Sequence, residues 1–131
     1  MINNLKKSIY DCLSSQETLN FTQLHGIFTY VDKNELFPYI CISVDDIEDN
    51  SNFNKNIYKC RIVIDIYDKN VSVNFATDLS EEIKEIFKNK SNFTSEYFSI
   101  IDILFNKIDI SLENNKIWKI RVFFEFIISC N

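Results

Sequence analysis

Two stretches in the middle of the chain alternate apolar and polar residues with the period of a β-strand. Residues 37–44 have the sequence FPYICISV, and residues 57–68 have the sequence IYKCRIVIDIYD. Both are rich in β-branched and aromatic residues, which suit a half-buried pleated surface, and successive side chains of a strand point to opposite faces. The pattern predicts two neighbouring central strands of an antiparallel sheet, with one face in the core and the other mostly in solvent.

Two amphipathic helices and three further strands are predicted around this centre. Apolar residues three and four apart predict helices at 3–14 and 71–88, with Lys69 and Asn70 capping the second. A short strand is expected at 27–31. Two long strands at 98–110 and 116–129, joined by a turn around Asn114, are expected to form a hairpin. In the last strand the even positions from Trp118 to Ile128 are the core set.

The order of these elements is helix, three strands, helix and two strands. It predicts an α+β domain of two layers, with two helices on one face of an antiparallel or mixed sheet of about five strands. A chain of 131 residues, 46% of them hydrophobic, suits a single domain over residues 1–131. We expect no second domain.

Three local features qualify this picture. Gly26, the only glycine, is predicted to adopt a backbone conformation that other residues avoid. Pro38, the only proline, is expected at the start of a strand, where a missing N–H is tolerated. The segment from Asp45 to Asn56 is predicted to be a strand end followed by a long polar loop. Its acidic residues lack the spacing and the glycine of a calcium loop, so we expect a solvated acidic edge.

Composition and charge exclude several classes of protein. A net charge of −5 argues against a sequence-independent grip on nucleic acid, which needs basic side chains. The apolar runs are too short to span a membrane, and the N-terminus lacks the apolar centre of a signal peptide, so we expect a cytoplasmic protein. Four cysteines without a CxxC pair favour reduced, small apolar residues over a metal site.

Motifs that carry chemistry are missing from the sequence. His25 is the only histidine, and it is expected to be a turn residue beside Gly26 rather than part of a catalytic triad. No GxSxG, HExxH, P-loop or GxGxxG pattern occurs. We therefore predict a protein that is not an enzyme, with no catalytic, cofactor-binding or metal-binding residues.

The face of the predicted sheet that turns away from the helices carries an unusual number of large apolar groups. The alternation places on it the following residues: Tyr39, Val63, Tyr67, Ile100, Leu104, Phe123 and Ile127. A patch of that size is larger than a soluble monomer usually exposes. Either a loop or the first helix covers it, or it is a subunit interface. In the second case we expect Tyr39, Val63, Tyr67 and Phe123 in the contact.

Nucleic-acid binding is a weaker alternative for the same face. A basic strip forms there if the third and last strands are neighbours, because they and the last turn carry Lys59, Arg61, Lys116, Lys119 and Arg121. Aromatic side chains such as Tyr67 could then stack on bases. Acidic residues on the same face cancel much of this positive field, so binding is not expected.

The order of motifs resembles the phage tail-completion proteins over nearly the whole chain. The similarity is carried by an N-terminal helix, the Gly26-Ile27-Phe28 segment, the Phe37-Pro38-Tyr39 strand start, a long strand ending at Asp68 and a helix with Ala76, Leu79 and Ile83. The chain is similar to a family of unknown function found in prophages and gene transfer agents, which in turn resembles the tail terminators of long-tailed phages.

This resemblance implies a non-enzymatic assembly protein. Such proteins are expected to form a ring, usually of six subunits, that caps the tail tube and joins it to the head connector protein. The implied partners are further copies of the chain, the tail tube protein and the head connector, and the implied location is the virion tail. The alternative is a small cytoplasmic interaction domain without a virion role.

Overall fold

The computed structural model describes residues 1–16, 24, 26–29, 36–70 and 72–130. Their elements are α1 (Ile2–Ser14), β1 (Gly26–Phe28), β2 (Tyr39–Asp49), β3 (Asn56–Asp68), α2 (Asn74–Phe87), the 3₁₀ turn η1 (Lys90–Asn92), β4 (Phe98–Glu113) and β5 (Ile117–Cys130). The predicted α+β class and the predicted order of helices and strands are confirmed. The predictions for His25 and for residues 30–31 lie outside the described residues.

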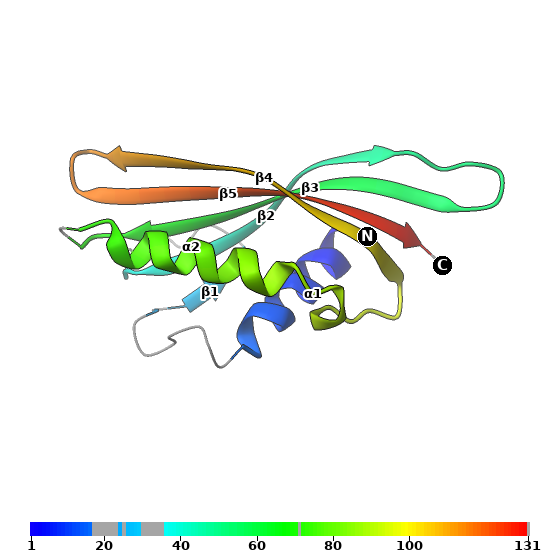
Figure 1. Cartoon of the computed structure of the whole chain (residues 1–131), viewed down its shortest axis with the longest axis horizontal. Coiled ribbons are helices and arrows are strands. Elements are labelled where there is room, and N and C mark those ends of the chain that lie inside the picture. The colour runs from blue at the N-terminus through cyan, green and yellow to red at the C-terminus, as the bar shows by residue number, and fades with distance from the viewer. Residues whose placement is uncertain (17–23, 25, 30–35, 71, 131) are drawn as a thin grey trace.

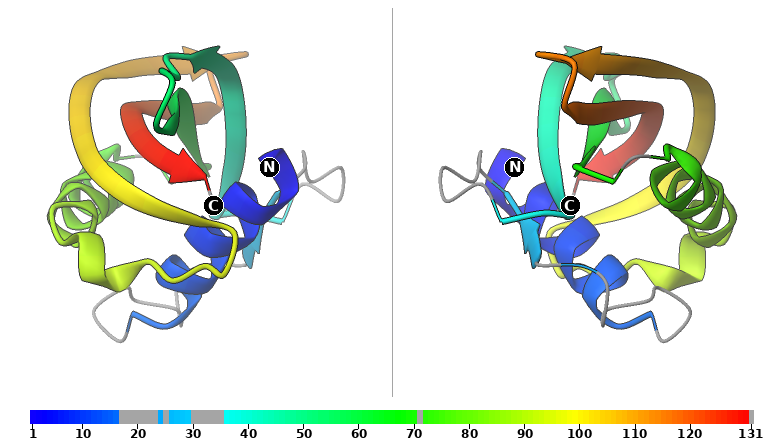
Figure 2. Two further views of the ribbon diagram at one scale, coloured as in Figure 1. Left: turned by 90° about the vertical axis from the view of Figure 1, so that its right-hand side faces the viewer. Right: turned by 90° about the vertical axis from the view of Figure 1, so that its left-hand side faces the viewer.

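The five strands form one mixed sheet in the order β1-β2-β3-β5-β4. Strand β1 runs parallel to β2, and the other neighbouring pairs are antiparallel. The strands converge near the centre of Figure 1 and fan out to both sides, which shows a strong twist. As a result, the β2–β3 hairpin extends at one end of the molecule and the β4–β5 hairpin at the other, as the two end views of Figure 2 also show.

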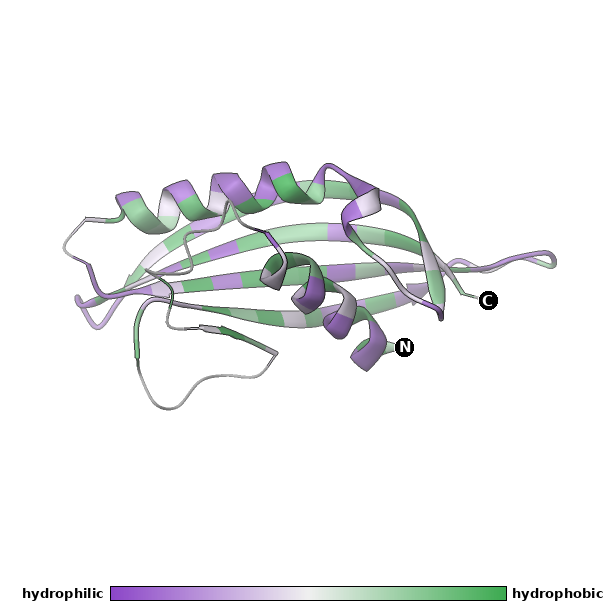
Figure 3. Cartoon of the chain, turned by 90° about the horizontal axis from the view of Figure 1, so that it is seen from below, coloured by the Kyte–Doolittle hydropathy of each residue, from purple (hydrophilic) through white to green (hydrophobic). Residues whose placement is uncertain are grey.

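Both helices cover the same face of the sheet (Figure 3). Their apolar stripes pack on the inward side chains of the three central strands, from Ile40 in β2 to Ile128 in β5. At the centre lies a group of aromatic rings: Phe87 is 4.6 Å from Phe124 and 5.6 Å from Phe126, measured between ring centroids. The even positions of β5 from 120 to 128 are all buried, as the alternation predicted.

Two predicted boundaries shift in the structure, the first because a side chain bonds to the backbone and the second because β2 continues past a bulge. Helix α2 begins at Asn74, not at residue 71, and Asn70 does not cap it. Instead, the backbone N–H of Asn70 donates to Asp68 Oδ1 at 3.1 Å. Strand β2 continues to Asp49 beyond a bulge at Asp45, where the register shifts, so only the second half of the predicted polar loop is a turn.

Two further predictions are corrected by packing. Ile100 lies opposite Ile128 and packs against the core, because bulges in β4 change which side chains point inward. Gly26 does not have a positive φ angle. A Cβ atom at this position would lie 2.8 Å from Cζ of Phe28, so the room for that ring, and not an unusual backbone conformation, favours glycine there.

Candidate functional site

The candidate site is the sheet face that points away from the helices, which we call the outer face. The register of the four long strands sets its members. They are Tyr39, Cys41, Ser43, Asp46 and Glu48 in β2; Lys59, Arg61, Val63, Asp65 and Tyr67 in β3; Lys119, Arg121, Phe123, Glu125 and Ile127 in β5; and Asp102, Leu104, Lys107, Asp109 and Ser111 in β4. Charged and apolar side chains therefore alternate across the face.

The strand pairing brings the four predicted interface residues together in two pairs. Tyr39 lies opposite Tyr67, and their rings stack with centroids 4.8 Å apart. Val63 lies opposite Phe123. Tyr39 and Val63 are already buried within the single chain, whereas Tyr67 and Phe123 are half-buried. A partner that docks here would therefore touch Tyr67 and Phe123, with Tyr39 and Val63 beneath them.

Neighbouring side chains, and not a helix, account for this burial. The rings of Phe28 and Phe37 pack against Tyr39, at centroid distances of 5.9 and 5.4 Å. Lysine and arginine side chains lie over the half-buried rings, with Lys119 Nζ 5.5 Å from Tyr67 and Lys107 Nζ 4.8 Å from Phe123. Both described helices lie on the other face of the sheet (Figure 3). The outer face thus keeps amphipathic side chains at its surface, which suit a contact that is apolar and charged at once.

A buried carboxylate lies at the centre of the outer face. Asp65 accepts a hydrogen bond from Arg121 Nε at 2.9 Å, and its side chain is only 10% exposed. Burial raises the pKa of Asp65 above the ordinary 3.8, because it outweighs the opposing effect of Arg121. Burial and the nearby charge of Asp65 together raise the pKa of Tyr67 to about 12. This part of the face therefore contains one ion pair between a buried carboxylate and a partly exposed guanidinium.

The raised pKa of Asp65 predicts a pH-dependent stability. The folded state binds this proton more tightly than the unfolded state, so stability relative to a non-titrating Asp65→Asn variant should fall as pH rises above 3.8. The groups whose charges act on Asp65 or respond to it are Arg121, Lys119, Glu113, Tyr67 and Cys41. Denaturant unfolding of both proteins from about pH 3 to 7 measures the effect.

The matched control for this measurement is Asp102→Asn, which removes an exposed carboxylate from the same face. It matches Asp65→Asn in removing one negative charge, but it leaves the ion pair of Asp65 with Arg121 in place, so the fall in stability with rising pH should persist in this variant. A wild-type advantage over Asp65→Asn that grows with pH would contradict the assigned direction.

Ion pairs on the outer face also bear on the nucleic-acid alternative. Strands β3 and β5 are neighbours, so the predicted basic residues do come together. However, the cations of the two strands each contact a carboxylate: Lys59 with Glu125 at 3.5 Å, Arg61 with Asp45 at 3.9 Å, Lys119 with Glu113 at 3.7 Å and Arg121 with Asp65 at 2.9 Å. These pairs leave little positive field to attract phosphates.

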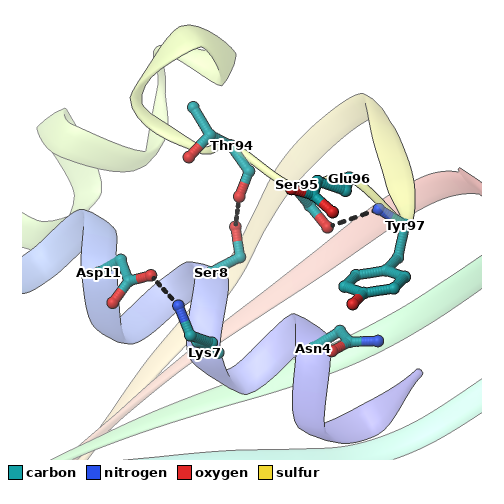
Figure 4. Close-up of a pocket in the computed structure, with 8 residues that line it drawn as sticks. All are labelled: Asn4, Lys7, Ser8, Asp11, Thr94, Ser95, Glu96 and Tyr97. Atoms are coloured by element: carbon teal, nitrogen blue, oxygen red, sulfur yellow. Dashed lines mark hydrogen bonds and ion pairs between the residues drawn. The ribbon is translucent and has the colours of Figure 1, made fainter.

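A polar pocket of about 570 Å³ lies between α1 and the segment that leads into β4 (Figure 4). Ser8 Oγ donates to the carbonyl of Thr94 at 3.1 Å, and Lys7 Nζ contacts Asp11 Oδ2 at 3.0 Å. Ser8 and Lys7 thus bond to other groups of the chain and not to each other. The polar groups of the pocket help to hold α1 against the chain before β4.

Burial makes two of the four cysteines unreactive. All four are free thiols, and three of them are buried. Burial raises the pKa of Cys12 to about 12 and, with Cys130 and Asp46 as weaker causes, that of Cys60 to about 11, so neither is a thiolate near neutral pH. Within the described ranges no three histidine, cysteine or acidic side chains gather as metal ligands, and no helix is long and apolar enough to cross a membrane.

One exposed residue was not singled out by the sequence patterns. Phe53 lies at the turn between β2 and β3, and its side chain is fully exposed. The sequence signal that marks it is a lone aromatic residue among serine, asparagine and lysine in residues 50–56. Exposed aromatic residues on an ordered turn often anchor protein contacts.

Comparison with known proteins identifies the fold. No family model matches the chain, and no curated protein matches it. Among solved structures, a chain in the virion of a native gene transfer agent (GTA) particle has the same fold. Its TM-score is 0.84 at 14% sequence identity, and the match covers 97% of this chain and 96% of that chain. At this identity the match shows a shared fold over nearly the full length of both chains.

Proposed function

We propose that this chain is a structural protein of a phage-like particle, without enzymatic activity. The observation that carries the proposal is the shared fold with a chain of a gene transfer agent virion, which leaves almost no residue of either chain unmatched. The same particle type was expected from the resemblance of the sequence to prophage and gene transfer agent proteins.

More specifically, we propose a tail-completion role. In this role the protein forms a ring, of six subunits, that caps the tail tube and joins it to the head connector. Two features of the outer face support a repeated contact: half-buried Tyr67 and Phe123 remain available to a partner, and charged side chains surround them. A head-to-tail contact between different surfaces closes into a ring when its rotation divides a full turn.

The site chemistry supports a binding role over a catalytic one. Among the described residues with raised pKa values, Cys12 and Cys60 are buried in the core, and Asp65 is held in an ion pair with Arg121. The polar pocket beside α1 uses its serine and lysine in bonds to the chain itself. Such a surface recognises other proteins rather than transforming a small molecule.

Light scattering across a concentration series tests the ring. We expect a species with six times the subunit mass of 15.5 kDa, formed cooperatively with few smaller oligomers. Pelleting with isolated tail tubes tests the capping role, and the protein should sediment at tube ends. A protein that remains a 15.5 kDa monomer and also fails to sediment with tubes would favour the alternative, a small interaction domain without a virion role.

A further inference from the structure

The tip of the β2–β3 hairpin presents one aromatic side chain on an ordered turn. Asn52 Oδ1 accepts hydrogen bonds from the backbone N–H groups of Asn54 and Lys55, both at 3.0 Å. Ser51 Oγ accepts another from the N–H of Ile57 at 3.1 Å. Phe53 at this turn is fully exposed. Because the turn is already held in place, binding through Phe53 costs little ordering of the backbone.

A pocket of about 480 Å³ lies at the other end of the sheet. It is lined by Lys69 and Asn70 after β3, Leu112 near the end of β4, Asn115 and Lys116 in the β4–β5 turn, and Trp118 at the start of β5. Leu112 is 43% exposed, and Trp118 opposite it is half-buried. Helix α2 begins at Asn74 and packs further along the sheet, so these two apolar side chains are left beside the two lysines.

The two features are complementary in charge. The hairpin segment 45–56 carries four carboxylates against one lysine, whereas Lys69 and Lys116 line the pocket. The β2–β3 turn, which carries Phe53, and the β4–β5 turn, which lines the pocket, also lie at opposite ends of the long axis of the molecule (Figure 1). A hairpin therefore cannot reach the pocket of its own chain, but it can reach the pocket of another copy.

The pocket lies on the helix side of the sheet. Trp118 lies opposite Leu112 and one position along β5 from Lys119, so its side chain points to the face opposite the one that carries Lys119 and Tyr67. The contact proposed below is therefore separate from the contact proposed on the outer face.

We propose that the β2–β3 turn of one copy inserts Phe53 into the pocket formed by Leu112, Lys116 and Trp118 of a second copy. The contact joins two different surfaces, so it repeats head to tail. This inference adds a specific contact to the proposed function. It rests on that function because it takes a second copy of the chain as the partner. The carboxylates of the hairpin face the lysines of the pocket, so added salt should weaken the association.

A pair of variants tests the anchor by light scattering of the full chain. Phe53→Ser should weaken self-association at least about 30-fold, the effect of losing an aromatic anchor. The matched control is Tyr97→Ser, which removes another exposed aromatic residue from outside the contact and should change association less than about threefold. If Phe53→Ser associates as strongly as the unchanged protein, the proposed contact is overturned. The ring, and the proposed function that depends on it, would still stand.

Disulfide trapping tests the geometry. Both partners carry Cys130→Ser. Cys130 lines the same pocket as Phe53, so its thiol would compete for disulfide formation with a cysteine introduced there. Mixing Asn54→Cys, which keeps the Phe53 ring, with Lys116→Cys should give a linked dimer on a non-reducing gel, and mixing Asn54→Cys with exposed Glu81→Cys on α2 should not. Linking to Glu81→Cys as readily as to Lys116→Cys, or no linked dimer from an oligomeric sample, would overturn the inference. A sample that is monomeric at every concentration would overturn it too, and tube pelleting then decides the proposed function separately.

Discussion

Replacing Phe123 with aspartate is expected to leave a folded monomer and to abolish the ring. Phe123 lies half-buried on the outer face, with Lys107 and Arg121 over its ring, so an aspartate there can pair with either cation in the monomer. Between protomers the same carboxylate would be desolvated in place of an aromatic contact. Loss of such an anchor together with burial of a charge should weaken association by more than about 100-fold.

The readouts separate folding from assembly. Far-ultraviolet circular dichroism and denaturant unfolding should show a folded Phe123→Asp chain, and light scattering should show a single subunit mass. Phe123→Leu is the matched control, because it keeps an apolar side chain at the same position and should keep the ring. An aspartate variant that still has the mass of the ring would refute the placement of Phe123 between protomers.

Replacing Phe124, the next residue along β5, is expected to have the opposite profile. Phe124 is 1% exposed and its ring lies 4.6 Å from Phe87 in the core. Phe124→Ala should lower the free energy of unfolding by about 3–5 kcal/mol, the cost of lost burial together with a cavity. Urea denaturation measures the change.

The control for this cavity is Phe105→Ala. Phe105 pairs with Phe124 across β4 and β5 but is 42% exposed, so its removal should cost less than about half as much. Equal losses for the two variants would mean that the core does not centre on β5 as described. Together, Phe123 and Phe124 test the two faces of one strand at adjacent positions.

The alternation of apolar residues predicted which of these two positions is buried, and the structure agrees. A strand has a period of two residues, so a regular run such as residues 120–128 assigns every side chain to a face without knowledge of its partners. The same logic failed for Ile100. Bulges in β4 insert residues that no local pattern announces, and each insertion exchanges the two faces beyond it.

Burial on the outer face could not be predicted from the sequence. Val63 was placed on that face correctly, but the structure buries both Val63 and Asp65, which shares the face, within the single chain. Asp65 of β3 is bonded to Arg121 of β5 across 56 positions of sequence. Local spacing carries no information about such a pairing, because it depends on which strands become neighbours.

The candidate contact surfaces divide in the same way. Phe53 could have been noticed as a lone aromatic residue in a polar segment, since that signal is local. The pocket of Leu112 and Trp118 could not, because it depends on where the β4–β5 turn meets the chain after β3. Its position opposite the β2–β3 hairpin arises from the twist and order of the whole sheet.

By itself, the sequence determined the class of fold, the order of its elements and the inward face of each regular strand. These follow from short-range periodicity, which a chain carries wherever it folds. Tertiary structure alone decided the strand order β1-β2-β3-β5-β4, the burial of Asp65 beneath Arg121 and the two complementary ends of the molecule. Each of these joins residues far apart in the chain, and such contacts form only when the sheet closes its full set of hydrogen bonds and buries its core.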